Sequence, residues 1–132
     1  MSFLLDTDTC SAALKQDPRV FNRFVQYGGR LYTSRIVLAE LYAWAFRASN
    51  PLNRLDAIER LQGEVALIEF TDDCARWYGR LRLQLLALGQ SVPSIDLLIA
   101  ASALAFDHTL VTHNTKDFMP VPGLRVVDWL VS

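Results

Sequence analysis

The 132-residue chain has little of what marks secreted, membrane-spanning or strongly polyanion-binding proteins. It contains two cysteines, Cys10 and Cys74, and no signal-peptide pattern precedes them, so we expect free thiols and a cytoplasmic protein. Its apolar runs, such as residues 97–106, are much shorter than the roughly 20 residues that span a bilayer. A formal net charge of −1 neither indicates nor excludes a nucleic-acid partner, because balanced totals can hide a basic patch.

The residues that are present predict one compact domain over residues 1–132. Hydrophobic residues make up 52% of the chain and charged residues 20%, which is enough apolar surface for a proper core. Short apolar runs alternate with longer segments of helical periodicity, a pattern typical of a parallel sheet flanked by helices. Strands are predicted at residues 3–6, 31–33, 66–70, 109–112 and 125–127.

The helices are predicted from apolar spacing and from residues that start or stop a helix. They cover residues 9–14, 18–27, 35–48, 52–62, a long segment from 72 or 73 to 88, and 95–106. The expected N-caps are Asp17, Ser34, Asp72 or Asp73, and Ser94. The second helix is expected to bury Val20, Phe21, Phe24 and Val25, and the tail is expected to pack back through Trp129 and Leu130.

Four acidic residues attract attention because of where this layout places them. Asp6 ends the first strand, Glu40 borders the apolar stripe of the third helix, Asp96 lies in the first turn of the most apolar helix, and Asp117 follows a buried strand. Each has an ordinary structural explanation; an acid at a helix N-terminus, for example, is stabilised by about 0.3 to 1 kcal/mol. Together they are expected to converge above one edge of the sheet.

A converging group of acids requires a compensating cation. Without one, repulsion raises the pKa of at least one member, whereas Mg²⁺ or Mn²⁺ is bound well by carboxylate and water oxygens. His108 and His113 stand apart from each other and from the cysteines, so the chain has no zinc-type cluster. An all-oxygen metal site is suited to phosphoryl chemistry.

The order and surroundings of these acids resemble the PIN-domain nucleases, and most closely the VapC toxins of bacterial toxin-antitoxin pairs. The resemblance covers essentially the whole chain. It is carried by FLLDT at 3–7, LAEL at 38–41, DLLIAA at 96–101, LVTHNTKDF at 110–118 and the ending PGLRVVDWL at 122–130. Each motif alone is weak, but the ordered set is specific.

This resemblance implies a three-layer α/β/α sandwich and a metal-dependent endoribonuclease that hydrolyses RNA with a metal-activated water. It implies Asp6, Glu40, Asp96 and Asp117 as catalytic metal ligands, Mg²⁺ or Mn²⁺ as cofactor, a VapB-type antitoxin as partner and a homodimer. Structured RNAs such as tRNA are the implied substrate class, and no membrane is involved. Candidate supporting residues are Ser34, Thr112 and Asn114, each of which also fits ordinary turn or cap chemistry.

Asp8 departs from the family, which commonly has Asn at this position. It either adds a fifth acid to the site or caps the first helix. For RNA binding, Arg76 and Arg80 near Trp77 are candidates, because guanidinium and aromatic planes suit phosphates and unstacked bases. Arginines at helical spacing are also typical of a solvated face. The apolar hairpin over residues 37–61 is open to two interpretations, dimerisation or the binding of an antitoxin segment.

Two other functions are compatible with parts of the sequence. The opening residues also resemble haloacid-dehalogenase-like phosphatases, with Asp6 as nucleophile, Asp8 as general acid, and Thr112 and Lys116 as later motif residues. The chain is short for that core and lacks a complete final acidic pair. The third hypothesis is a catalytically silent PIN-like binding module, against which the four retained acids argue.

Overall fold

The structure, a computed structural model, describes residues 1–131 and is built on one five-stranded sheet. Its strands are β1 (Phe3–Leu5), β2 (Leu31–Ser34), β3 (Ala66–Ile68), β4 (Thr109–Val111) and β5 (Val126–Val127). The strand order is β3-β2-β1-β4-β5, and every neighbouring pair is parallel. The prediction of a central parallel sheet is confirmed.

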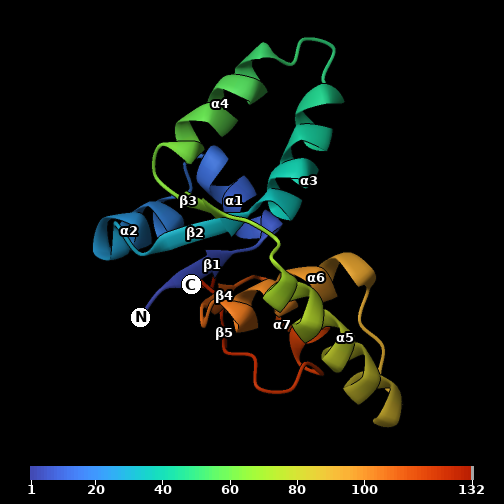
Figure 1. Cartoon of the computed structure of the whole chain (residues 1–132). Helices are drawn as coiled ribbons and strands as arrows, with labels where there is room; N and C mark the ends of the chain where they lie inside the picture. Colours follow the sequence, from blue (N-terminus) through green and yellow to red (C-terminus); the bar gives the residue numbers. More distant parts are fainter. Residues whose placement is uncertain (132) are drawn as a thin grey trace.

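Helices cover both faces of this sheet, as Figure 1 shows. On one side lie α1 (Thr7–Leu14), α2 (Pro18–Tyr27), α3 (Arg35–Phe46) and α4 (Leu52–Gln62), with α1 in contact with the other three. On the other side lie α5 (Asp72–Ala87), α6 (Ser94–Ala105) and the short α7 (Thr115–Phe118), with α6 in contact with both. The predicted three-layer α/β/α sandwich is therefore confirmed.

The core lies on either side of the two central strands. All three residues of β1 and all three of β4 are buried, as expected for parallel strands covered on both faces. Trp129 closes one end of the core, with its ring 5.3 Å from that of Phe3 and 6.0 Å from that of Tyr27, as predicted for the tail. Cys10 and Cys74 are buried free thiols, also as predicted. No helix in residues 1–131 has both the length and the apolarity needed to cross a membrane.

Two of the predicted helix N-caps are observed, and the other two are not. Asp17 and Ser34 cap α2 and α3 as predicted, accepting the backbone N–H groups of Arg19 and Val37. The predicted cap at Asp72 or Asp73 is wrong, because the Thr71 hydroxyl caps α5 and the two acids occupy its first turn. Ser94 does not cap α6 either.

The first residues of α6 and α1 differ from the predicted ones, and the residue before each helix explains why. Helix α6 begins at Ser94 itself, directly after Pro93, whose ring restricts the backbone where the helix starts. Helix α1 begins at Thr7 rather than at the predicted Thr9, because Asp6 is its N-cap and accepts the Thr7 N–H. The acid that ends the first strand therefore also starts the first helix.

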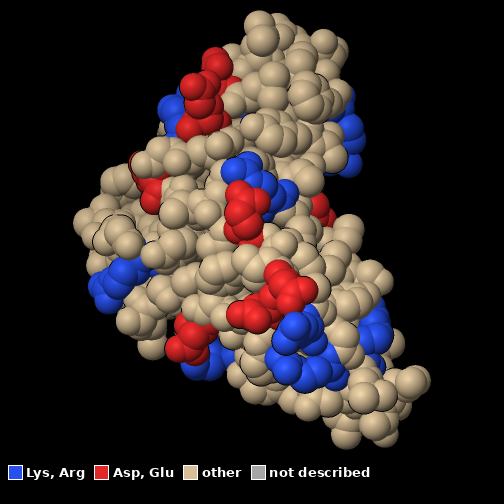
Figure 2. Space-filling view, viewed as in Figure 1, with Lys and Arg blue, Asp and Glu red and all other residues tan. Residues whose placement is uncertain are grey.

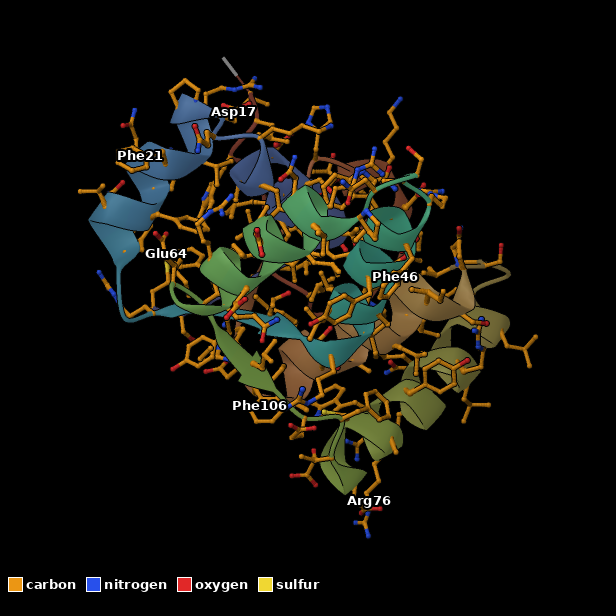
Figure 3. All side chains as sticks on the ribbon, turned by 90° about the horizontal axis from the view of Figure 1, so that it is seen from above. Asp17, Phe21, Phe46, Glu64, Arg76 and Phe106 are labelled. Carbon is orange, nitrogen blue, oxygen red and sulfur yellow. The ribbon has the colours of Figure 1, made fainter. Side chains whose placement is uncertain are left out.

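The predicted core face of α2 is half wrong. Val20 and Phe24 are buried, but Phe21 is 62% exposed and Val25 70% exposed. The covering helix α4 packs beside α2 without closing over it, which leaves a groove of about 330 Å³ whose lining includes Phe21 and Glu64. Figure 3 shows these two side chains on α2 and just beyond α4. Periodicity identifies an apolar side of a helix but not how much of it is covered.

Candidate active site

The candidate site lies at the edge of the sheet where the parallel strands end. The order of the strands reverses between β1 and β4, and such a switch point forms a crevice at the carboxyl ends of the strands. Asp6 follows β1 and Thr112 follows β4. The Thr112 hydroxyl donates a hydrogen bond of 2.8 Å to Asp6 Oδ2 and so joins the two sides of the switch point.

Asp6 is the most buried acid of the candidate quartet, with 7% of its surface exposed. Its pKa is raised from 3.8 to about 6, mainly by burial and to a lesser extent by the negative charges of Asp8 and Asp96. Hydrogen bonds from the Thr7 N–H, at 2.8 Å, and the Thr112 hydroxyl act in the opposite direction. The carboxylate is therefore expensive to ionise in this position.

Glu40 projects from α3, the helix that follows β2, and is half-buried. The Thr7 hydroxyl donates to Glu40 Oε1 at 2.5 Å, which links the start of α1 to α3. Thr7 was missed by sequence reasoning, although its position directly after Asp6 was a usable signal. Ser34 is buried, and its hydroxyl accepts the Val37 N–H at 3.1 Å, so its observed contact fixes the helix that carries Glu40.

Asp96 reaches the same edge from the other face of the sheet. It lies in the first turn of α6, and because α6 leads into β4 and runs back against it, the start of α6 lies where β4 ends. Burial raises the pKa of Asp96, and the charges of Asp117, Glu40 and Asp8 add to this shift. Asp96 therefore lies within electrostatic range of each of the other three predicted ligands, Asp6, Glu40 and Asp117.

Asp117 is exposed on α7 and is held by the loop that precedes it. Asn114 donates from Nδ2 to Asp117 Oδ2 at 2.5 Å, and its backbone N–H donates to the Thr112 hydroxyl oxygen at 3.1 Å. His113 turns the other way, with Nδ1 2.9 Å from Asp128 Oδ2 in the tail. The loop thus connects Asp117 to Thr112, and through Thr112 to Asp6.

Asp8 is oriented differently from the four predicted ligands. Its Oδ2 accepts the His113 N–H at 3.0 Å and lies 3.3 Å from the Thr112 hydroxyl, and its Oδ1 accepts the Thr9 hydroxyl at 3.2 Å. Because Asp6 caps α1, the predicted capping role of Asp8 is wrong. Asp8 does belong to the acidic edge, as its effect on Asp6 and Asp96 shows.

The acids lack a basic partner. Within residues 1–131, no Lys, Arg or His forms an ion pair with Asp6, Asp8, Glu40, Asp96 or Asp117. An all-carboxylate set without a cation fits a hard divalent ion. In the same residues, no three His, Cys, Asp or Glu side chains are arranged to enclose a metal by themselves. These facts agree, because Mg²⁺ commonly keeps several waters and binds through one or two carboxylates.

The arginines proposed for RNA binding lie outside this cluster. Arg76 pairs with Asp72 at 2.9 Å, and Figure 3 shows it pointing outward from α5. The Arg80 guanidinium lies 4.8 Å from the centre of the Trp77 ring. Figure 2 shows acidic and basic side chains interspersed over one face, with the outline indented between the α3–α4 hairpin and the α5–α6 pair. Within residues 1–131, neither arginine forms a hydrogen bond or an ion pair with the acidic edge.

Known proteins with the same architecture match this chain over nearly its whole length. The model of the PIN domain family matches residues 3–123. The chain is 31% identical to "Ribonuclease VapC2" of Rickettsia felis and 32% identical to "tRNA(fMet)-specific endonuclease VapC" of Shigella flexneri, each alignment covering 98% of both chains. It superposes on a chain of the DNA-bound VapBC crystal structure from Salmonella typhimurium with a TM-score of 0.93, 29% identity and 98% coverage of both chains. The chain therefore belongs to the PIN-domain family and, within it, to the VapC ribonucleases.

Proposed function

We propose that this chain is a Mg²⁺- or Mn²⁺-dependent endoribonuclease and the toxin of a VapBC-type pair acting in the cytoplasm. Asp6 and Asp96 are the proposed direct metal ligands, and Glu40 and Asp117 bind the ion directly or through water. The observation that carries the proposal is Asp6, a buried carboxylate at the switch point that is surrounded by other acids and has no basic partner.

The residues divide the chemistry among themselves. When bound, a divalent ion lowers the pKa of a water and neutralises charge on the phosphodiester. Thr112 and the Thr7 N–H orient the two oxygens of Asp6. Thr7 orients Glu40, and Asn114 orients Asp117. In this way each neutral donor fixes a carboxylate without cancelling its charge, which leaves the charge available to the ion.

The phosphatase hypothesis is set aside on two grounds. The chain belongs to the PIN family over most of its length. In addition, Asp8 Oδ2 accepts the His113 N–H, and Oδ1 lies 3.2 Å from the Thr9 hydroxyl, whose one proton it shares with the Val111 carbonyl. A general acid must reach the leaving group with its proton, whereas Asp8 Oδ2 is directed at the backbone of the loop after β4.

The proposed substrate is a structured RNA such as tRNA. One relative, 32% identical, is named as a tRNA(fMet)-specific endonuclease, and this chain shares its length. Arg76 and Arg80 on α5 are the proposed RNA contacts, with the Trp77 ring under Arg80 at 4.8 Å as a surface for stacking. Replacing both arginines by alanine is expected to raise KM for RNA and leave metal binding unchanged.

A VapB-type antitoxin and a second copy of the chain are the proposed protein partners. Several crystal structures that this chain resembles are of VapBC complexes. The groove between α2 and α4, lined by Phe21 and Leu61 among others, suits an amphipathic antitoxin segment. Leu83 and Leu86, 68% and 76% exposed and three residues apart on α5, together with Phe46 on α3, offer apolar surface for a homodimer.

The decisive experiment is cleavage of labelled tRNA by purified, antitoxin-free protein with Mg²⁺, with Mn²⁺ and with EDTA. Asp6→Asn and Asp96→Asn are tested beside Asp73→Asn, which changes an exposed acid in the first turn of α5. We expect metal-dependent cuts that the first two variants lose by about 1,000-fold or more and that the third retains. Cleavage that persists in Asp6→Asn or in EDTA rejects the proposal. Folded, metal-binding protein that cleaves no RNA favours the silent binding module.

A further inference from the structure

Asp8, like Asp6, has both carboxylate oxygens within hydrogen-bond distance of protein donors, and of the two only Asp8 accepts a backbone N–H of the loop after β4. Oδ2 lies 3.0 Å from the His113 backbone nitrogen, and Oδ1 lies 3.2 Å from the Thr9 hydroxyl. Glu40 and Asp117 each have a single hydrogen bond, to one oxygen. Asp8 is therefore satisfied by the protein, whereas those two carboxylates each keep a free oxygen.

The hydroxyl of Thr112 lies between Asp6 and Asp8 and has only one proton to donate. It is 2.8 Å from Asp6 Oδ2 and 3.3 Å from Asp8 Oδ2, so the shorter contact assigns the proton to Asp6. Its oxygen also accepts the Asn114 N–H at 3.1 Å. The orientation of Asp6 thus depends on where the loop after β4 places Thr112.

The backbone of Thr112 is fixed at the end of β4, where its N–H donates to the Val127 carbonyl at 3.0 Å, and the loop beyond Thr112 is held from two sides. On the outer side, His113 Nδ1 meets Asp128 in the tail at 2.9 Å, through a side chain that is mostly exposed. On the inner side, next to Asp6, the loop backbone is held by Asp8 through the His113 N–H. Breaking the inner contact frees the loop at the residue that directly follows Thr112.

We propose that Asp8 is a positioning residue that fixes the loop after β4, and with it Thr112, so that Thr112 orients the metal-facing carboxylate of Asp6. Asp8 is not itself a metal ligand. This inference rests on the proposed metal-dependent function and names a role for the acid that departs from the family pattern.

Two substitutions at Asp8 separate positioning from ligation. Asp8→Asn keeps a carbonyl oxygen for the His113 N–H, and its amide donates to the Thr9 hydroxyl oxygen, so positioning survives while the charge is lost. Asp8→Ala removes every contact. Losing a residue that orients a metal ligand typically costs 10- to 100-fold in metal affinity. We expect that loss for Asp8→Ala and a change of less than about threefold for Asp8→Asn.

The measurement is a Mn²⁺ titration of RNA-free protein, followed through the paramagnetic resonance signal of the free ion. Asp128→Asn is the matched control, because it weakens the outer contact to the same histidine, and it is expected to bind Mn²⁺ like the wild type. In parallel, hydrogen exchange of the His113 amide reports whether the loop is released; it is expected to accelerate in Asp8→Ala and not in Asp8→Asn. If Asp8→Ala does not fold, Asp8→Ser replaces it, because a serine side chain is too short to reach the His113 N–H.

Equal loss of Mn²⁺ affinity in Asp8→Asn and Asp8→Ala overturns the proposal in favour of direct ligation or charge. Unchanged affinity in the truncated variant overturns it as well. The ribonuclease proposal is tested separately by RNA cleavage: wild type that binds Mn²⁺ without cutting RNA refutes that proposal alone, and the roles of Asp8 are still read from the titration. A wild type that binds no Mn²⁺ overturns both.

Discussion

The two edges of the sheet each contain a buried titratable side chain, and the protein treats them in opposite ways. At the carboxyl edge, Asp6 is 7% exposed and lies among acids that raise its pKa. At the amino edge, His108 is 8% exposed, contacts the Ser2 hydroxyl through Nδ1, and stacks on Tyr32 with ring centres 4.5 Å apart. Burial lowers the pKa of His108 and so favours its neutral form, which these neighbours satisfy.

The difference between the two edges supports the carboxyl edge as the candidate site. The amino edge pairs its charges: Arg125 donates both to Asp107 and to the Thr109 hydroxyl. At the carboxyl edge the acids have no basic partner among residues 1–131, and keeping them charged costs free energy. Uncompensated like charges in a crevice are expected at functional sites, where local stability is given up for activity.

The largest effect is expected from Asp6→Asn. Cleavage should fall by about 1,000-fold or more, because the proposed central metal ligand loses its charge. At pH 7.5 without metal, the free energy of unfolding should rise by about 1 to 3 kcal/mol, because a carboxyl group with a raised pKa no longer has to ionise in a buried position. Urea unfolding in EDTA measures the gain. A loss of both activity and stability would show that Asp6 is structural and would break the contrast between the edges.

The pH dependence of stability sharpens the same contrast. Asp6 has a folded pKa of about 6 against an ordinary value of 3.8, so its contribution to stability is complete below 3.8 and is lost as the pH rises through 6. Metal-free wild type should therefore gain about 1 to 2 kcal/mol relative to Asp6→Asn when the pH falls from 7.5 to 5. Parallel stability curves for the two proteins would contradict the raised pKa.

The sequence predicted this contrast only in part. The position of Asp6 follows from the parallel arrangement of the strands. The N-cap Asp17, followed by Pro18 at the start of α2, was predicted from residue type. Asp96 lies at the expected edge for a different reason. Its helix, α6, precedes strand β4 instead of following a strand, so the start of α6 lies near the end of β4. Local patterns predict at which end of the sheet a candidate residue lies when the topology leaves one place for it.

The parts that could not be predicted depend on contacts between distant segments. Phe21 and Val25 have the spacing of a core face, and only the placement of α4 leaves them exposed. The place of Thr7 beside Asp6 could be read from the sequence, but its contact with Glu40, 33 residues away, could not. Asp8 looked like a ligand or a cap, and only the loop after β4 shows that its oxygens are already engaged.

A smaller effect is expected at the amino edge from His108→Phe. The folded pKa of His108 is lowered, so its contribution to stability is present above its ordinary pKa of 6.5 and is lost as the pH falls below that value. The phenylalanine keeps the stack on Tyr32 but loses the Ser2 contact, which should cost about 1 kcal/mol at pH 8 and less at pH 5. Thermal unfolding at both pH values tests this, and RNA cleavage should not change. A large loss of cleavage would mean that the two edges are not independent.

The smallest effect concerns two helix ends that point away from the carboxyl edge. Gln16 after α1 and Asp107 after α6 both have left-handed backbone angles, with φ of 58° and 57°. A side chain costs roughly 1 kcal/mol in this conformation, so Gln16→Gly should raise the free energy of unfolding by about 0.5 to 1 kcal/mol. Asp107→Gly is the matched control and should gain less, because it also removes the 3.0 Å contact with Arg125. Equal gains would show that this ion pair contributes nothing to stability, whereas a loss of cleavage in either variant would show that the amino end also serves the chemistry.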